Sequence, residues 1–131
     1  MLERLREILA ADPRVAYALV FGSVASDRPG PHSDVDVALG LAANATLNLL
    51  ELGALASRLE AAAGRPVDLV LLGEATPGLA YRIFRDGRPL LVRDAAALAA
   101  RKARAILEYL DFQPFEEIFA SGALAAADLG R

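Results

Sequence analysis

The sequence predicts an α/β (α+β) fold in which a small mixed sheet of about four strands is flanked by helices. Two observations carry this prediction. Ala contributes 28 residues and Leu 23, against 12 for Val and Ile together, so residues that favour helix outnumber those that favour strand. Short runs typical of strands also alternate with amphipathic stretches along the chain. The length of 131 residues suits a single domain, 1–131.

The first part of the chain is expected to form one helix and two strands. Apolar residues at helical spacing over 2–9 predict an amphipathic helix, which is closed at Asp12 and the proline after it. The apolar run 15–21 and the run 34–39, which alternates acid with aliphatic residues, both predict strands. The prolines between these strands leave room for at most a short helix after Ser23.

A second helix and a third strand are expected next. Thr46 is positioned to cap a helix that ends at Gly64. The apolar run 67–72 then predicts a strand. The helix residues expected to face inward are Leu47, Leu50, Leu55 and Leu59.

The remainder of the chain is expected to be mostly helical. Pro77 opens a helix, and the run 88–92 predicts the fourth strand. Residues 95–110 predict a long Ala-rich helix, and Pro114 starts a shorter one. Residues 94–131 are therefore expected to form a helical C-terminal extension of the domain.

Composition and charge exclude several classes of function. The net charge of −3 disfavours binding to polyanions such as nucleic acid. A chain without cysteine forms no disulfide and no thiolate metal site. The first residues are charged where a secretory signal would be apolar, and the longest uncharged stretch, 37–50, is too short to span a bilayer. We therefore expect a cytoplasmic protein without a transmembrane helix.

Three acids interrupt the predicted strands where hydrophobic residues are expected. Because successive side chains of a strand point to opposite faces, Asp34 and Asp36 share one face while Val35 and Val37 occupy the other. Asp68 interrupts the third strand in the same manner. If the two strands are neighbours, the three carboxylates converge.

Converging carboxylates without histidine or cysteine favour Mg²⁺ over Zn²⁺, because Mg²⁺ prefers hard oxygen ligands. Magnesium held by carboxylates completes its coordination shell with water and substrate phosphates, which indicates a nucleoside triphosphate. The acid pair is equally compatible with solvated carboxylates on an edge strand, with Asp68 unrelated to them. The choice depends on what lies beside the acids.

A Gly22-Ser23 step follows the first predicted strand. Glycine allows the backbone to approach an anion, and a serine at a helix N-cap presents its hydroxyl and free N–H groups to phosphate oxygens. The step is therefore a candidate phosphate site. Taken alone, it is also typical of an ordinary turn from a strand to a helix.

The joint pattern, Gly-Ser-x10-Asp-x-Asp followed by Asp68 in a later strand, is more specific than its parts. It resembles the polymerase-beta-type nucleotidyltransferase superfamily. The run 20–39 is similar to the minimal nucleotidyltransferases, the MNT domains. The resemblance continues through 67–68 and 86–92 and reaches 109–114, a run similar to that of the MntA-like antitoxins of HEPN/MNT toxin-antitoxin pairs.

This resemblance implies the nucleotidyltransferase fold and a Mg²⁺-dependent enzyme that moves AMP from ATP to a hydroxyl, expected to be a tyrosine, of a partner HEPN toxin. Gly22 and Ser23 would hold the triphosphate. Asp34 and Asp36 would bind two Mg²⁺ ions, and Asp68 would ligate the catalytic metal and help activate the acceptor hydroxyl.

One segment departs from the family pattern, and two other functions stay open. Many members carry Ala-Arg-Gly after the Gly-Ser-x step, where this chain has Ala25-Ser26-Asp27, so Arg28 is the candidate replacement for the missing arginine. The first alternative is a non-catalytic antitoxin that neutralises its partner by binding. The second is a nucleotidyltransferase of small molecules, of the aminoglycoside type.

Overall fold

The computed structural model describes residues 1–22 and 34–111. Its elements in chain order are α1 (Leu2–Ala10), β1 (Val15–Phe21), β2 (Val35–Leu41), α2 (Leu49–Ala63), β3 (Val67–Leu71), the 3₁₀ turn η2 (Leu72–Glu74), α3 (Pro77–Asp86), β4 (Arg88–Val92) and a helix over 95–111. The segment after Ser23, where at most a short helix was expected, and the helix expected from Pro114 lie outside the described residues. Among the described helices, none combines the length and the apolar character needed to cross a membrane.

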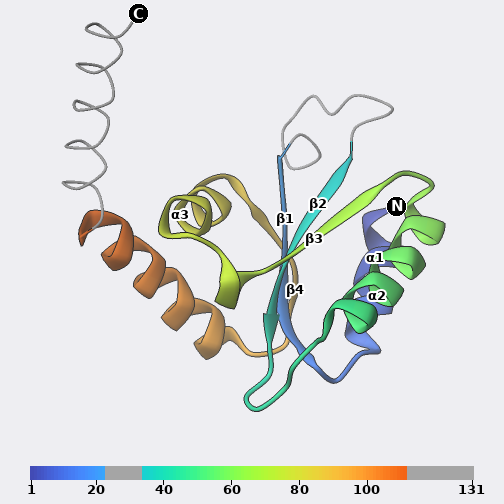
Figure 1. Cartoon of the computed structure of the whole chain (residues 1–131), viewed down its shortest axis with the longest axis horizontal. Coiled ribbons are helices and arrows are strands. Elements are labelled where there is room, and N and C mark those ends of the chain that lie inside the picture. Colours follow the sequence, from blue (N-terminus) through green and yellow to red (C-terminus); the bar gives the residue numbers. More distant parts are fainter. Residues whose placement is uncertain (23–33, 112–131) are drawn as a thin grey trace, which may run out of the picture.

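The four strands form one mixed sheet in the order β3-β2-β1-β4 (Figure 1). Strand β1 runs antiparallel to both β2 and β4, whereas β2 and β3 are parallel. A parallel pair needs a crossover connection, and α2 supplies it between β2 and β3. The predicted mixed sheet flanked by helices is confirmed, and the fourth strand has the predicted bounds.

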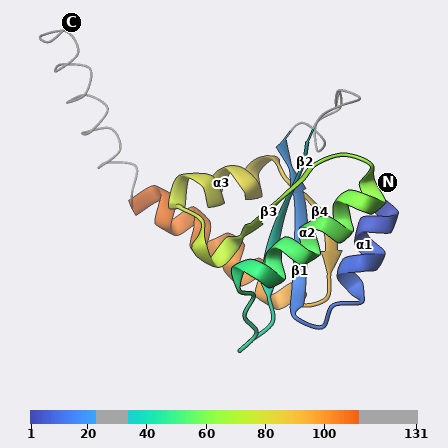
Figure 2. The same cartoon turned by 45° about the vertical axis from the view of Figure 1, so that its right-hand side comes forward.

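Helices cover both faces of the sheet (Figures 1 and 2). Helices α1 and α2 pack on one face, in a core cluster that contains Val37. Helix α3 and helix 95–111 lie against the other face, in a cluster that contains Ala38. Those two helices also meet through Tyr81 and Tyr109, whose rings stack with centroids 4.0 Å apart. Because side chains alternate along β2, this strand contributes residues to two separate hydrophobic cores, one on each face of the sheet.

Helix α2 begins two residues later than the sequence predicted. Its N-cap is Asn48, which accepts a hydrogen bond from the Glu51 amide at 2.8 Å, while the Glu51 carboxylate accepts one from the Asn48 amide at 3.0 Å. This reciprocal capping box satisfies two amide donors, whereas Thr46 offers no glutamate three residues on, so the prediction of Thr46 as the cap was wrong.

The prediction that Leu50 faces inward was also wrong, since its side chain is 84% exposed. Leu55 and Leu59 are buried as predicted. Five residues of α-helix correspond to a rotation of roughly 140° between Leu50 and Leu55, which turns Leu50 away from the sheet. Leu47 is buried, but it precedes the helix.

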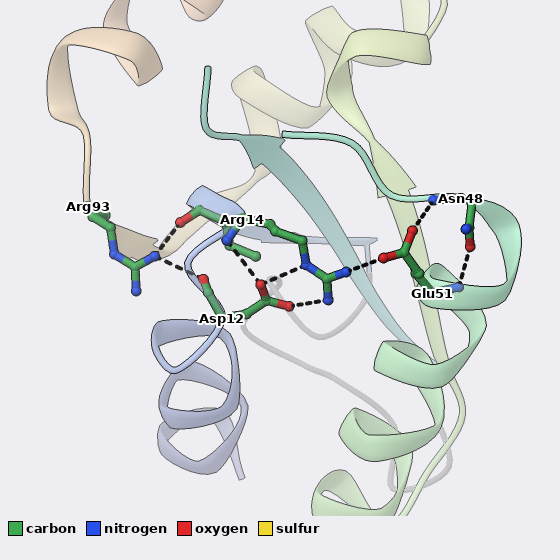
Figure 3. Close-up of polar contacts among 6 residues, drawn as sticks. Asp12, Arg14, Asn48, Glu51 and Arg93 are labelled. Atoms are coloured by element: carbon green, nitrogen blue, oxygen red, sulfur yellow. Dashed lines mark hydrogen bonds and ion pairs between the residues drawn. The ribbon is translucent and has the colours of Figure 1, made fainter. Parts of the chain in front are cut away.

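A polar network joins the ends of α1 and β4 to the start of α2 (Figure 3). The Arg14 side chain donates to the buried carboxylate of Asp12 through Nε at 2.9 Å and Nη2 at 2.8 Å, and to Glu51 at 2.7 Å. Arg93 donates to the backbone oxygens of Asp12 and Val15 at 2.9 and 2.7 Å. The hydrogen bonds from Arg14 hold the pKa of Asp12 below its ordinary value.

Candidate active site

Asp36 and Asp68 face each other across the parallel pair β2 and β3. Each is the second residue of its strand, so the register brings the two carboxylates to the same height at the amino ends of the strands. Asp34 directly precedes β2 and, two residues before Asp36, is expected to point to the same face. The predicted condition for convergence, that the two strands are neighbours, is met.

The three acids differ in their exposure. Asp34 and Asp68 are exposed, whereas Asp36 is half-buried. The residues that flank Asp36, Val35 and Val37, are fully buried in the core beneath α1 and α2. Asp36 is therefore held on the opposite face by two packed neighbours, which fixes the position of its backbone.

Gly22 lies directly against Asp36. It follows the last residue of β1, Phe21, which pairs with Asp36 in the sheet. Its φ of +72° is in the left-handed region, and a Cβ atom there would overlap the Asp36 carboxylate. Glycine is thus required twice, by the backbone conformation and by the close approach. The sequence predicted an approach of Gly22 to an anion, and among the described residues the nearest anion is the carboxylate of Asp36, which the sequence pattern did not indicate. Ser23 lies outside the described residues.

The electrostatics at Asp36 favour a bound cation. Burial, followed by the charges of Asp68 and Asp34, raises the pKa of the Asp36 carboxyl above its ordinary value. A positive charge placed between these carboxylates would relieve their repulsion. Nowhere in 1–22 or 34–111 do three acidic, histidine or cysteine side chains lie close enough to hold a metal ion on their own.

An open set of carboxylates fits the coordination habits of Mg²⁺. This ion is commonly bound through one or two carboxylates, with water and substrate phosphates as the remaining ligands. Asp36 and Asp68 offer hard oxygen donors without competing nitrogen or sulfur. The arrangement is thus chemically suited to a divalent cation shared with a phosphorylated substrate.

The family of the chain follows from comparison with known proteins. The family described as polymerase beta, nucleotidyltransferase, matches residues 3–96, more than half of the chain. The chain belongs to this nucleotidyltransferase family. The match spans Gly22, Asp34, Asp36 and Asp68, and so includes the whole acid site. No curated protein matches the chain.

Solved structures share the fold of this nucleotidyltransferase. A chain of a toxin-antitoxin complex with AMP-PNP is 22% identical, with a TM-score of 0.83 over 94% of this chain and 98% of that one. A complex of a tri-AMPylated HEPN toxin from Shewanella oneidensis with its MNT antitoxin gives 21% identity and a TM-score of 0.74, over 95% and 99%. A candidate minimal nucleotidyltransferase is 29% identical, with a TM-score of 0.55 over 66% and 89%.

Proposed function

We propose that this protein is a Mg²⁺-dependent adenylyltransferase that moves AMP from ATP to a hydroxyl, expected to be a tyrosine, of a partner HEPN toxin and thereby acts as its antitoxin. The observation that carries the proposal is the carboxylate pair of Asp36 and Asp68, with Gly22 packed against Asp36. Family membership supports nucleotidyl transfer. The similar structures support ATP as the nucleotide and a HEPN toxin as the partner, since one of them holds AMP-PNP and another contains an AMPylated HEPN toxin.

We propose Asp34, Asp36 and Asp68 as the metal ligands and catalytic residues, with Gly22 and Ser23 at the triphosphate. When bound, Mg²⁺ supplies positive charge that neutralises the triphosphate and lowers the pKa of the acceptor hydroxyl. Asp36 is the best anchored of the three acids, because its strand neighbours are fully buried. Asp68, which is exposed beside it, can face an acceptor that arrives from solvent.

The transfer itself is an in-line displacement at phosphorus. The acceptor oxygen forms a bond to the α-phosphorus, the bond from that phosphorus to the bridging oxygen breaks, and pyrophosphate leaves. The hydroxyl proton must leave the acceptor, and Asp68 is the carboxylate proposed to assist its removal. The chain contributes positioning and charge, which are the main requirements of phosphoryl transfer.

The test is AMP transfer to a purified partner. The chain is incubated with ATP, Mg²⁺ and a purified HEPN-domain partner, and the partner is weighed by intact mass spectrometry. Added AMP mass is expected with the wild-type chain and with Asp111→Asn, a control at an exposed acid on helix 95–111. Asp36→Asn should add none, and transfer at the wild-type rate by this variant would contradict the assignment.

The same experiment separates the alternatives. A stable complex without added AMP would favour an antitoxin that acts by binding alone. An aminoglycoside added to the same mixture tests the other alternative, since AMP added to it and not to the partner would favour a small-molecule transferase. We also propose that residues 1–131 act in the cytoplasm as one minimal nucleotidyltransferase domain, with 94–131 as its helical extension.

A further inference from the structure

A cavity of about 430 Å³ lies at the carboxyl ends of β2 and β3, the opposite end of this strand pair from Asp36 and Asp68. In open parallel α/β sheets, the crevice outside the carboxyl ends of the strands is a common place for ligands, and β2 and β3 are the parallel pair of this sheet. The wall of this cavity includes Gly40, Thr46, Gly73, Glu74, Arg101 and Arg104. None of them belongs to the acid site.

Arg101 has donors that the described part of the chain does not satisfy. Its Nη2 donates to the backbone oxygen of Leu72 at 3.0 Å, just beyond the end of β3. Its Nε and Nη1 are buried and have no hydrogen-bond partner among the described residues. A guanidinium stays charged in proteins, so this side chain cannot lose the proton to lower the cost. Buried donors without acceptors are costly. Because Arg101 lines the adjoining cavity, a shift of its guanidinium toward that space would bring these donors to an acceptor bound there.

The other charged groups of the cavity wall do not accept hydrogen bonds from the Arg101 side chain. Arg104 is already paired, through Nε, with the Glu108 carboxylate at 2.6 Å. Glu74 is the acid on the wall, and it is exposed to solvent rather than bonded to Arg101. The rest of the wall combines the aliphatic ends of the two strands with the loop after β2 and Tyr17 of β1. Such a site suits a compact molecule with an anionic head and an apolar body.

We propose that this cavity binds a small organic oxyanion, a carboxylate or a phosphate monoester, whose oxygens accept hydrogen bonds from Arg101. Its apolar body would lie against the ends of β2 and β3. Binding at this place requires neither Mg²⁺ nor the acids, so it is independent of the proposed transferase reaction.

The experiment uses the full chain in Mg²⁺-free buffer, so that the acid site does not contribute. Benzoate, phenyl phosphate and inorganic phosphate are titrated separately, and the backbone amide shifts of Gly40, Thr46 and Gly73 are followed by NMR. Saturable shifts with benzoate, with phenyl phosphate or with both support the proposal and identify the preferred head group. Shifts with inorganic phosphate alone, or shifts that do not saturate, would overturn it.

Variants decide whether Arg101 carries the binding. Arg101→Gln is expected to weaken binding at least about tenfold, and Arg101→Lys, which keeps the charge but loses the planar fork, should bind less tightly than the wild type. Arg6→Gln, an exposed arginine on α1 across the sheet, is the matched control and should bind normally. Circular dichroism establishes that each variant is folded. Equal binding by folded Arg101→Gln, or by Arg101→Lys if the glutamine variant does not fold, would contradict the proposal.

Discussion

The two ends of the β2 and β3 pair differ in charge although they belong to the same parallel strands. At the amino end the register sets Asp36 beside Asp68, and at the carboxyl end it sets Leu39 beside Leu71, with Arg101 close by. A cation would relieve the repulsion at the first end. At the second end, an anion would accept hydrogen bonds from the Arg101 donors that have no partner among the described residues. One strand pair can therefore separate two opposite electrostatic requirements, each of which an external ligand can meet.

The largest expected effect is at the acid end. If Asp36 holds the metal ion as proposed, Asp36→Asn should reduce AMP transfer to the partner by at least about a hundredfold, because it removes a charge that would act in the transition state. The same change should leave the fold intact and raise the melting temperature in Mg²⁺-free buffer, since burial and neighbouring acids disfavour the ionised Asp36. Initial transfer rates and thermal unfolding measure both effects. A large loss of stability would show that Asp36 is structural.

Gly22→Ala should be the next most damaging change. A methyl group there would overlap the Asp36 carboxylate in a backbone with positive φ, so about 1–3 kcal/mol of steric cost adds to the strain of the left-handed conformation. Gly64→Ala is the matched control, because Gly64 has a φ of +69° and nothing within 4 Å of an added Cβ. It should lose only about 1–2 kcal/mol of unfolding free energy and keep its activity. Equal losses in urea unfolding would refute the role of the contact with Asp36.

The sequence was most informative where a local pattern determines the structure. Alternating acids predicted the shared face of β2, and the apolar run 88–92 predicted β4, because alternation and strand propensity are local properties. The sequence could predict that Asp36 and Asp68 lie together only if their strands are neighbours. Whether they are neighbours depends on the crossover through α2, which no local pattern specifies.

Features that depend on tertiary packing could not be predicted. The start of α2 was misplaced although its signal is local, since Asn48 is followed three residues later by Glu51, the capping-box pattern that Thr46 lacks. The two Arg101 donors without a partner among the described residues have no signal in the sequence, because their environment is formed by β2, η2 and helix 95–111 together. The contact of Gly22 with Asp36 likewise depends on the register of β1 and β2. The signal that could have indicated this contact is a glycine directly after a strand whose last residue pairs with an acid on the neighbouring strand.

At the carboxyl end, Gly40→Ala should destabilise the fold without touching the acids. A Cβ atom at Gly40 would overlap the buried ring of Tyr17, and we expect a loss of about 1–3 kcal/mol in unfolding free energy. Gly53→Ala is a control for which the expected change in unfolding free energy has the opposite sign. Gly53 lies inside α2 with nothing within 4 Å, so alanine there should stabilise the protein by about 0.5–1 kcal/mol. Urea unfolding of both variants measures the difference, and a neutral Gly40→Ala would mean that the Tyr17 ring can move.

The smallest expected effect is the pH dependence contributed by Asp12, whose network lies at the same end of the sheet as Gly40. Its pKa in the folded state is held below the unfolded value by Arg14, so its contribution is fully present above the unfolded pKa and is lost as the pH falls through the folded one. The unfolding free energy of the wild type should therefore fall more steeply on acidification below about pH 4 than that of Asp12→Asn, which has no carboxyl group to protonate. Urea unfolding across this range measures the two slopes. Parallel slopes would mean that Asp12 has the same pKa in both states and that its bonds to Arg14 do not favour the ionised form.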